Sequence, residues 1–340
     1  MDPLTQGLLG ASFGQALCGR ALGRRALVWG GLVGMTPDLD VAMNATGPMG
    51  EWLHHRGASH SLWFGPVVGP LVGWLLWRLH GRRDPLAAWI GLAVVALFTH
   101  PLLDVFTSYG TMLLAPFSDR RFAWDAVAIV DPAYSLVLVA ALGLGLAWGP
   151  ASGRARIVAA AGLALTTAYL GYGLVLNHRA EDLARRQLAA EGVTAAEVRA
   201  YPTLLQVYLR RVVVRRGDEL RVGWLSLWRP APLEWHRFAD ARHPLAAAAR
   251  ATEEGRILEW FAMGQTAAAL VPSASGTVVE IDDLRYGFPS RPQAGLWGIR
   301  VRFDPDGRIE GRPQRVDRPL PAPAPVLLGQ LWRGTFGLAP

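Results

Sequence analysis

Acidic and histidine side chains are concentrated in four short motifs within the first 131 residues of an otherwise apolar stretch of chain. Ionisable groups at the edge of a bilayer are costly unless they pair, hydrate or bind an ion, so they are candidates for a functional site. Carboxylate oxygens and neutral imidazole nitrogens are common ligands of divalent metals. The motifs are TPDLD (residues 36–40), HHRGASH (54–60), THPLLD (99–104) and WDAVAIVD (124–131).

The THPLLD motif places His100 and Asp104 four residues apart in an apolar segment that is expected to be helical. Residues at i and i+4 share one helix face, so the imidazole and the carboxylate are able to reach the same metal. Pro101 between them suggests a helix start or a kink at the membrane edge. The alternative is a hydrogen bond between His100 and Asp104 without a metal.

The TPDLD motif contains two carboxylates, Asp38 and Asp40, directly after Pro37. In an extended or turn segment both would point the same way, and their repulsion would be relieved by a cation. The alternative is a helix cap, Asp38 or Asp40, beside a solvated neighbour.

The HHRGASH motif contributes two further imidazoles, His55 and His60, on either side of Arg56 and Gly57. Neutral imidazole suits zinc, and the guanidinium of Arg56 is suited to holding a phosphate through paired N–H donors. The alternative is an interfacial loop that faces lipid headgroups. Asp131, in the fourth motif, either caps the helix that follows or completes a metal shell.

Composition restricts the classes of function. The formal net charge is +7 and the chain contains no lysine, yet its arginines form no aromatic-interleaved patch, so no nucleic-acid partner is expected. The single cysteine, Cys18, excludes an intrachain disulfide and a cysteine-based zinc site. The first residues lack the basic region of a cleavable signal peptide.

Apolar runs predict the helices that carry these motifs. A helix needs about 20 apolar residues to cross a bilayer core. Two shorter runs before the longer ones would form a tilted or re-entrant hairpin. We therefore expect a mainly α, polytopic bundle of four to six membrane helices, followed by a small soluble α+β domain. The longer runs are Ser61–Leu79, Leu86–Leu103, Ala133–Trp148 and Ile157–Leu176, and the shorter ones Gly7–Leu22 and Ala26–Met35.

The arginines of the connecting loops indicate an orientation. Three loops bear them and would lie on one side of the membrane, which the positive-inside rule assigns to the cytoplasm. The metal motifs then face the periplasm of a bacterial inner membrane, together with the C-terminal domain. Arg120 and Arg121 also fall on that outer side and count against the assignment. The three loops contain Arg20, Arg24 and Arg25; Arg78, Arg82 and Arg83; and Arg154 and Arg156.

The second half of the chain is polar, and its patterns predict both helices and strands. We divide the chain into a membrane domain (1–177), a soluble α+β domain (178–325) and a C-terminal tail (326–340). We find no internal repeat and no catalytic signature in the second half. The predicted elements are helices His178–Ala190 and Leu245–Met263, strands Tyr208–Val214, Leu220–Leu227, Thr277–Ile281 and Trp297–Phe303, and an extended segment Arg312–Pro325.

The motifs MDPLTQGLLG, PDLD, HRGASHS, THPLLD, PFSDRRF and IVDP together resemble the bacterial membrane-bound metal-dependent hydrolases of the YdjM-like type, over roughly residues 1–177. That family is distantly similar to zinc-dependent phospholipases C and single-strand nucleases. The resemblance implies a divalent metal, zinc before magnesium or manganese. Gln6 stands where the family usually has histidine, which implies a metal that is missing, weaker or different at that position. The implied ligands are Asp38, Asp40, His55, His60, His100, Asp104 and Asp131.

These observations predict a membrane-bound hydrolase that cleaves a phosphoester with a metal-activated water. Asp40 or Asp104 would act as general base, and Arg56 would hold the substrate phosphate. The expected partners are the lipid bilayer and a phosphorylated or lipid-linked substrate. The alternative is a non-catalytic membrane scaffold with a structural metal and a partner-binding C-terminal domain. A transporter is less favoured, because the polar residues lie at helix ends and not at the midplane.

Overall fold

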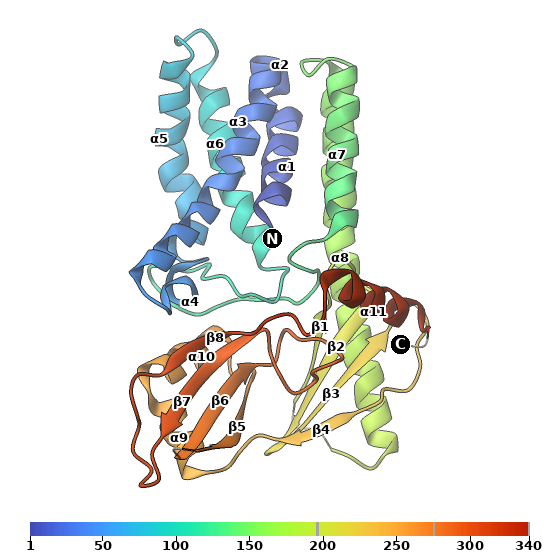
Figure 1. Cartoon of the computed structure of the whole chain (residues 1–340). Helices are drawn as coiled ribbons and strands as arrows, with labels where there is room; N and C mark the ends of the chain where they lie inside the picture. The colour runs from blue at the N-terminus through green and yellow to red at the C-terminus, as the bar shows by residue number, and fades with distance from the viewer. Residues whose placement is uncertain (195–196, 275, 339–340) are drawn as a thin grey trace. The chain divides into compact units, whose positions relative to one another are not determined.

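The computed structural model describes residues 1–194, 197–274 and 276–338. About half of the chain is helical, and the C-terminal part contains two antiparallel sheets (Figure 1). The chain forms two compact units, which we describe separately. Unit 1 comprises Met1–Met43, His54–Leu174 and Leu204–Gln206, and unit 2 comprises Asn44–Leu53, Val175–Thr203 and Val207–Pro340.

Unit 1 is a helical bundle that follows the predicted apolar runs closely. The first run is one helical segment interrupted by a π-helical turn, and the polar motifs lie on short helices between the longer ones. The elements of the N-terminal half are α1 (Pro3–Phe13), η1 (Gly14–Cys18), α2 (Gly19–Leu22), α3 (Arg24–Met35), η2 (Thr36–Thr46), α4 (Gly50–His54), η3 (Ala58–His60), α5 (Phe64–Leu79), α6 (Leu86–Asp104), α7 (Pro132–Ala147) and α8 (Gly153–Ala190). Most of α4, the end of η2 and the part of α8 from Val175 onward belong to unit 2.

Within the described residues, two helices are long and apolar enough to cross a membrane, namely α6 and α8. A third span results if Gly50–His60 and Phe64–Leu79 are counted together as one bent span. Helix α7 is apolar but has only 16 residues. The structure therefore supports two or three spans, and the larger number of four to six stays a prediction.

Helix α8 differs from the prediction in its length. The sequence suggests an apolar helix followed by a separate polar one, but both belong to a single helix of 38 residues. At about 1.5 Å per residue this helix is roughly 57 Å long, well beyond the thickness of a bilayer core. The change in hydropathy shows where the apolar part of the helix ends. The helix itself continues, because residues 174–190 contain no proline or glycine that would end it.

Glycines allow the helices of unit 1 to approach closely. A Cβ atom built on Gly10 would lie 2.2 Å from the carbonyl oxygen of Gly30, so α1 and α3 are in backbone contact. Helix α5 uses Gly65, Gly69 and Gly73, spaced four residues apart, to pack against α6. Such small-residue interfaces are typical of membrane helices. This packing fixes the ends of α3, α5 and α6, where the polar motifs begin or end.

Unit 2 contains two four-stranded antiparallel sheets, each with its strands in sequence order. The predicted hairpin is confirmed, since Leu209–Arg216 pairs with Glu219–Ser226. The first sheet consists of β1 (Glu197–Pro202), β2 (Leu209–Arg216), β3 (Glu219–Ser226) and β4 (His236–Ala239), and the second of β5 (Thr266–Ser273), β6 (Gly276–Asp283), β7 (Trp297–Phe303) and β8 (Gln314–Asp317).

Three features of unit 2 differ from the prediction. The segment expected as one helix is divided into α9 (Pro244–Ala251) and α10 (Glu253–Phe261), because Thr252 takes an extended conformation and caps α10. The proline-rich segment contains the short strand β8, which pairs with β7. The segment 326–340, expected as a tail, lies largely in helix α11 (Ala324–Phe336), whose Leu327 and Leu331 pack in an apolar cluster with Leu209.

Candidate metal centre

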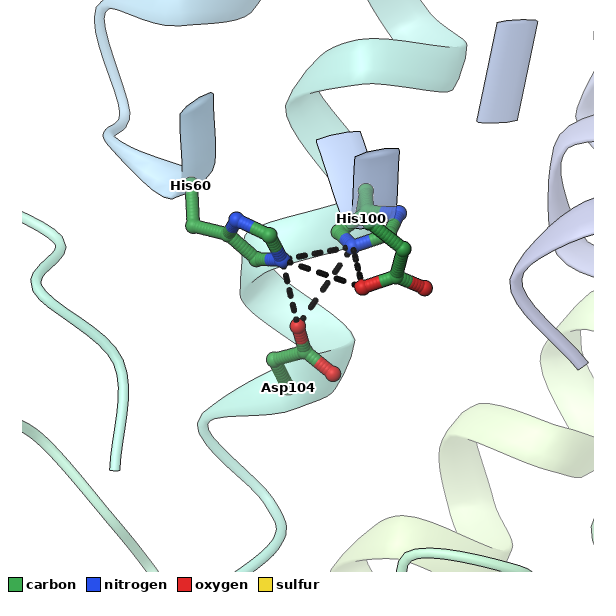
Figure 2. A group of neighbouring side chains, drawn as sticks. His60, His100 and Asp104 are labelled. Carbon is green, nitrogen blue, oxygen red and sulfur yellow. Dashed lines mark hydrogen bonds and ion pairs between the residues drawn. The ribbon is translucent and has the colours of Figure 1, made fainter. Parts of the chain in front are cut away.

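Four ionisable side chains from three separate motifs converge in unit 1. Asp38 comes from η2, His60 from η3, and His100 and Asp104 from the last turns of α6. One ligand atom from each lies within 4.8 Å of the other three. Figure 2 shows both imidazoles and the Asp104 carboxylate turned toward one point. All four side chains are buried, and Asp38 is the most exposed at 8%.

The four separations between an imidazole nitrogen and a carboxylate oxygen are close to those of a tetrahedral metal site. The two Nε2 atoms of His60 and His100 are 2.9 Å apart, and Asp38 Oδ1 lies 3.4 Å from each. Asp104 Oδ2 lies 3.2 Å from His60 Nε2 and 3.4 Å from His100 Nε2. A tetrahedron has an edge about 1.63 times its centre-to-corner distance, so zinc bonds of about 2.0–2.1 Å require donor separations of about 3.3–3.4 Å.

The outer nitrogens of both rings have hydrogen-bond acceptors. His100 Nδ1 donates to the carbonyl oxygen of Gly34 at 2.7 Å. His60 Nδ1 lies 3.1 Å from Asp40 Oδ2. With their protons on Nδ1, both rings present Nε2 lone pairs to the same point, which is the arrangement of metal-binding histidines. A shared proton or a cation would satisfy these facing lone pairs, and the two carboxylate oxygens 3.2–3.4 Å from these nitrogens favour the cation.

Asp38 and Asp40 do not point the same way. They lie on a 3₁₀ helix, η2, and not on an extended segment as expected. Three residues per turn rotate residues i and i+2 by about 240°, so the two carboxylates serve different partners. Asp40 accepts hydrogen bonds from His55 Nδ1 at 2.6 Å and from Ser59 Oγ at 2.7 Å. Asp40 thereby organises the HHRGASH loop, while Asp38 faces the two metal-facing imidazoles.

Both aspartates of η2 are held in the charged form. Burial acts to raise the pKa of Asp38, but hydrogen bonds with His100 and His60 hold it below its ordinary value. Burial also acts against the charged form of Asp40, and contacts with His55 and His60 lower its pKa in the same way. Charged carboxylates are the form that binds a cation.

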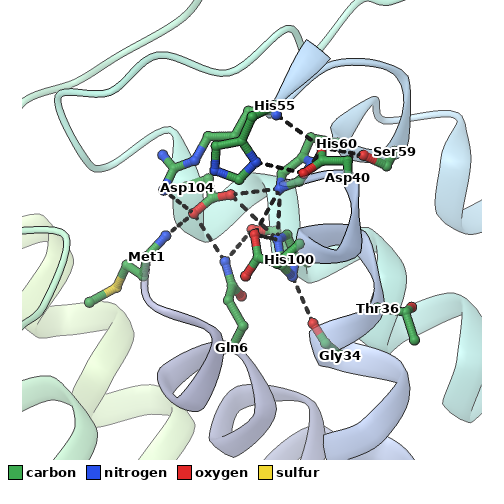
Figure 3. Close-up of polar contacts among 12 residues, drawn as sticks. Met1, Gln6, Gly34, Thr36, Asp40, His55, Ser59, His60, His100 and Asp104 are labelled. Carbon is green, nitrogen blue, oxygen red and sulfur yellow. Dashed lines mark hydrogen bonds and ion pairs between the residues drawn. The ribbon is translucent and has the colours of Figure 1, made fainter. Parts of the chain in front are cut away.

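The Oδ1 atom of Asp104, which does not face the two imidazoles, is surrounded by groups that donate hydrogen bonds or carry positive charge (Figure 3). Arg56 Nη2 lies 3.2 Å from Asp104 Oδ1, and its Nη1 donates to Thr107 Oγ1 at 2.8 Å. Gln6 Nε2 donates to the same carboxylate oxygen at 3.1 Å, and the amino group of Met1 contacts it as well. Arg56 is buried and has a positive φ of 61°, an uncommon conformation that marks a constrained loop.

Gln6 occupies the position where the family resemblance suggests a histidine. Its amide nitrogen also donates to the carbonyl oxygen of His100 at 3.1 Å. Its Oε1 atom is buried and has no hydrogen-bond partner among the residues that the structure describes. Gln6 therefore borders the cluster and holds an unused oxygen donor, but it supplies no imidazole.

The remaining residues suggested by the sequence lie outside the four-residue group. His55 and Asp40 form the adjacent pair described above. Asp131 caps α7 by accepting from Ala133 N at 3.1 Å, and Tyr169 donates its hydroxyl to Asp131 Oδ2 at 2.9 Å. Pro101 lies near the end of α6 and not at a helix start.

Sequence reasoning missed several supporting groups. The carbonyl oxygen of Gly34, 66 residues before His100, accepts a hydrogen bond from its ring. The hydroxyl of Thr107, in the turn after Asp104, donates to the carbonyl oxygen of Asp104. Ser59, within the HHRGASH motif, donates to Asp40 Oδ2 at 2.7 Å. Such contacts depend on helix packing, so only a fold could reveal them.

Comparison with known proteins shows a family match over the first half of the chain. The family model of the YdjM inner membrane protein matches residues 1–180, which contain all four residues of the group. A stretch of 116 residues is 28% identical to the uncharacterized protein YfhP of Bacillus subtilis (strain 168), covering 33% of this chain and 34% of that protein. The chain thus spans about a third of the curated relative that it matches. No solved structure matches.

Proposed function

We propose that this chain, which belongs to the YdjM inner membrane protein family, is a membrane-bound, metal-dependent hydrolase that cleaves a phosphoester. The convergence of two imidazole nitrogens and two carboxylate oxygens at tetrahedral spacing carries this proposal. A mixed nitrogen and oxygen set suits zinc, with manganese as the next candidate and magnesium less suited to imidazole.

We assign the metal ligands as Asp38, His60, His100 and Asp104. When bound, a divalent cation would acidify a coordinated water and stabilise negative charge on phosphoryl oxygens. Asp38 is the natural entry point for water and substrate, since it is the most exposed of the four.

The neighbouring residues would bind substrate and move protons. His55 donates from Nδ1 to Asp40, which leaves its Nε2 as an acceptor, and the side chain is 15% exposed. This pair would take a proton from the attacking water, with Asp40 stabilising the charged imidazole. Asp104 would serve as the alternative base only if its Oδ1 gave up its contacts with Arg56, Gln6 and the amino group of Met1. Arg56 supplies a buried positive charge for a substrate phosphate, provided that it exchanges Asp104 for the phosphate.

We also propose that the site faces the periplasm of a bacterial inner membrane, with the chain crossing it several times. Arg25 pairs with Asp84 at 2.5 Å, so two arginine-bearing connections meet at one end of unit 1. His60, four residues before the start of α5, and Asp104, the last residue of α6, lie at the other end of these two helices. Positive charge favours the cytoplasmic side, which leaves the metal centre on the other.

A turnover assay tests the hydrolase directly. The purified protein is stripped of metal, supplied with zinc, manganese or magnesium, and offered phosphodiesters, phosphomonoesters and phospholipids. One substrate class should be cleaved only in the presence of metal, and His100→Ala should abolish this turnover. His54→Ala is the matched control, because His54 is exposed in the same motif as His60 but lies outside the four-residue group. Equal activity in wild type and His100→Ala would refute the assignment.

One observation favours a second candidate, a scaffold with a structural metal. Four buried protein donors resemble a closed structural site, whereas catalytic zinc sites usually keep one position for water. Cobalt(II) substitution distinguishes the two, because its absorption spectrum reports coordination number. A hydrolase should change its spectrum when inorganic phosphate is added. A spectrum that stays four-coordinate at saturating phosphate would support the scaffold, with unit 2 as the partner-binding part.

A further inference from the structure

An apolar hollow of 540 Å³ lies on unit 1 beside the metal centre. The first turns of α5 contribute Trp63, Phe64, Val67 and Val68 to its lining, and the connection between α6 and α7 contributes Pro116 and Phe117. The only polar lining residue is Ser61. A hollow of this size is comparable to ligand pockets, which range over roughly 300–1,000 Å³.

The lining is exposed to an unusual degree for such apolar side chains. Phe117 is 80% exposed, Val67 71% and Trp63 50%. The rings of Trp63 and Phe117 stand edge to face, with centroids 6.1 Å apart, and form one wall. Helix α5 belongs to the bent pair that counts as a third candidate membrane span, and a hydrocarbon chain is the chemistry that fits an apolar hollow on such a span.

The polar end of the hollow adjoins the metal centre. Ser61 follows His60 directly in the chain and is buried. Leu62 N donates to the carbonyl oxygen of Leu113 at 3.0 Å, which ties the start of α5 to the connection that contains Phe117. Arg120, three residues beyond Phe117, is exposed and offers positive charge to an anionic headgroup. The hollow is therefore lined by apolar side chains, and its lining residues Ser61 and Phe117 lie close in the chain to the metal-facing His60 and to the cationic Arg120.

We propose that the hollow binds one acyl chain of a membrane phospholipid whose phosphate is directed to the metal centre. This inference rests on the proposed function and names its substrate class. The lipid lies with its chain along Trp63, Val67 and Phe117 and its phosphodiester next to His60. An amphipathic occupant of this kind matches both ends of the hollow, whereas a protein partner would leave the metal end unexplained.

The first experiment measures binding without turnover. The full chain in nanodiscs is irradiated with a phospholipid that carries a photoactivatable diazirine in one acyl chain. Adducts should concentrate on residues 61–68 and 116–117. Val67→Trp fills the hollow and should reduce these adducts at least about fivefold. Leu71→Trp is the matched control, since Leu71 lies one turn further along α5, is 57% exposed and does not line the hollow. An equal effect of both variants would show only general lipid contact and overturn the proposal.

The second experiment measures selectivity. Val67→Trp should raise the KM for a long-chain phospholipid about tenfold while leaving kcat and the cleavage of a water-soluble phosphodiester unchanged. Phe117→Ala, which removes one wall, should raise the same KM. Selective adducts without any phosphoester turnover would keep the hollow and refute the hydrolase. Cleavage of soluble diesters without selective adducts would keep the hydrolase and refute the hollow.

Discussion

Replacement of Asp40 by asparagine tests whether this residue supports the metal centre without binding the metal. Asp40 Oδ2 accepts from Arg56 N at 3.0 Å and from Ser59 Oγ at 2.7 Å, and lies 3.1 Å from His60 Nδ1. Its Oδ1 accepts from His55 at 2.6 Å. The side chain of asparagine keeps one oxygen, which still accepts from Arg56 N, Ser59 Oγ and His60 Nδ1. Its amide nitrogen then faces His55. The hydrogen bond to His60 therefore survives without its charge, which costs about 1 kcal/mol.

Second-sphere changes of this kind usually lower metal affinity 10–100-fold. We expect Asp40→Asn to weaken zinc binding about tenfold, equivalent to about 1.4 kcal/mol. Asp40→Ala, which removes every contact, should weaken it about 100-fold, and both variants should still bind one ion at saturation. Competition against a chelator of known affinity measures these constants. Asp84→Asn, at the opposite end of α5, is the control. Unchanged affinity in Asp40→Ala, or complete loss of binding in Asp40→Asn, would refute the assigned role.

Three further predictions concern the metal centre and unit 2. Gln6→His adds an imidazole beside the centre and should tighten zinc binding at least about tenfold, as measured by the same competition; weaker binding would contradict this reading of Gln6. Zinc affinity should fall as the pH is lowered, because protons compete for both imidazoles, and a pH-independent constant would exclude histidine ligands. Asp283→Asn leaves Arg285 buried without its charge partner and should lower the free energy of unfolding of unit 2 by about 3–5 kcal/mol in denaturant titrations. Asp317→Asn, a 65% exposed partner of an ion pair, should cost less than about 1 kcal/mol, and equal losses would refute the argument.

The helices of unit 1 were predictable because a bilayer leaves an apolar run few alternatives to a helix. The predicted bounds of α6 and α3 lie within two residues of those observed. Strand β5 was missed because its sequence, TAAALVPS, contains three alanines and lacks alternation; its strand conformation results from pairing with β6. Thr252 divides a helix that periodicity alone would continue.

The residue types of the site were predictable, but the sequence did not show which residues face the metal position and which support them. Residue types and the i, i+4 spacing suggested His100 and Asp104 as ligands, and these two share a face of α6. The sequence could not separate Asp38 from Asp40, since that depends on the 3₁₀ conformation of η2. The supporting contact from Gly34 is made by its backbone carbonyl oxygen. Every residue has such a group, so the identity of the residue could not reveal the contact.

X-ray absorption spectroscopy at the zinc edge tests the central claim most directly, since it reports the ligands of a bound ion in the full-length protein. We predict one zinc ion per chain with four nitrogen or oxygen neighbours at about 2.0–2.1 Å, and the multiple-scattering pattern of two imidazoles. His60→Ala should remove one imidazole from this pattern or abolish binding. A folded protein that takes up no zinc, or a spectrum without imidazole, would contradict the account.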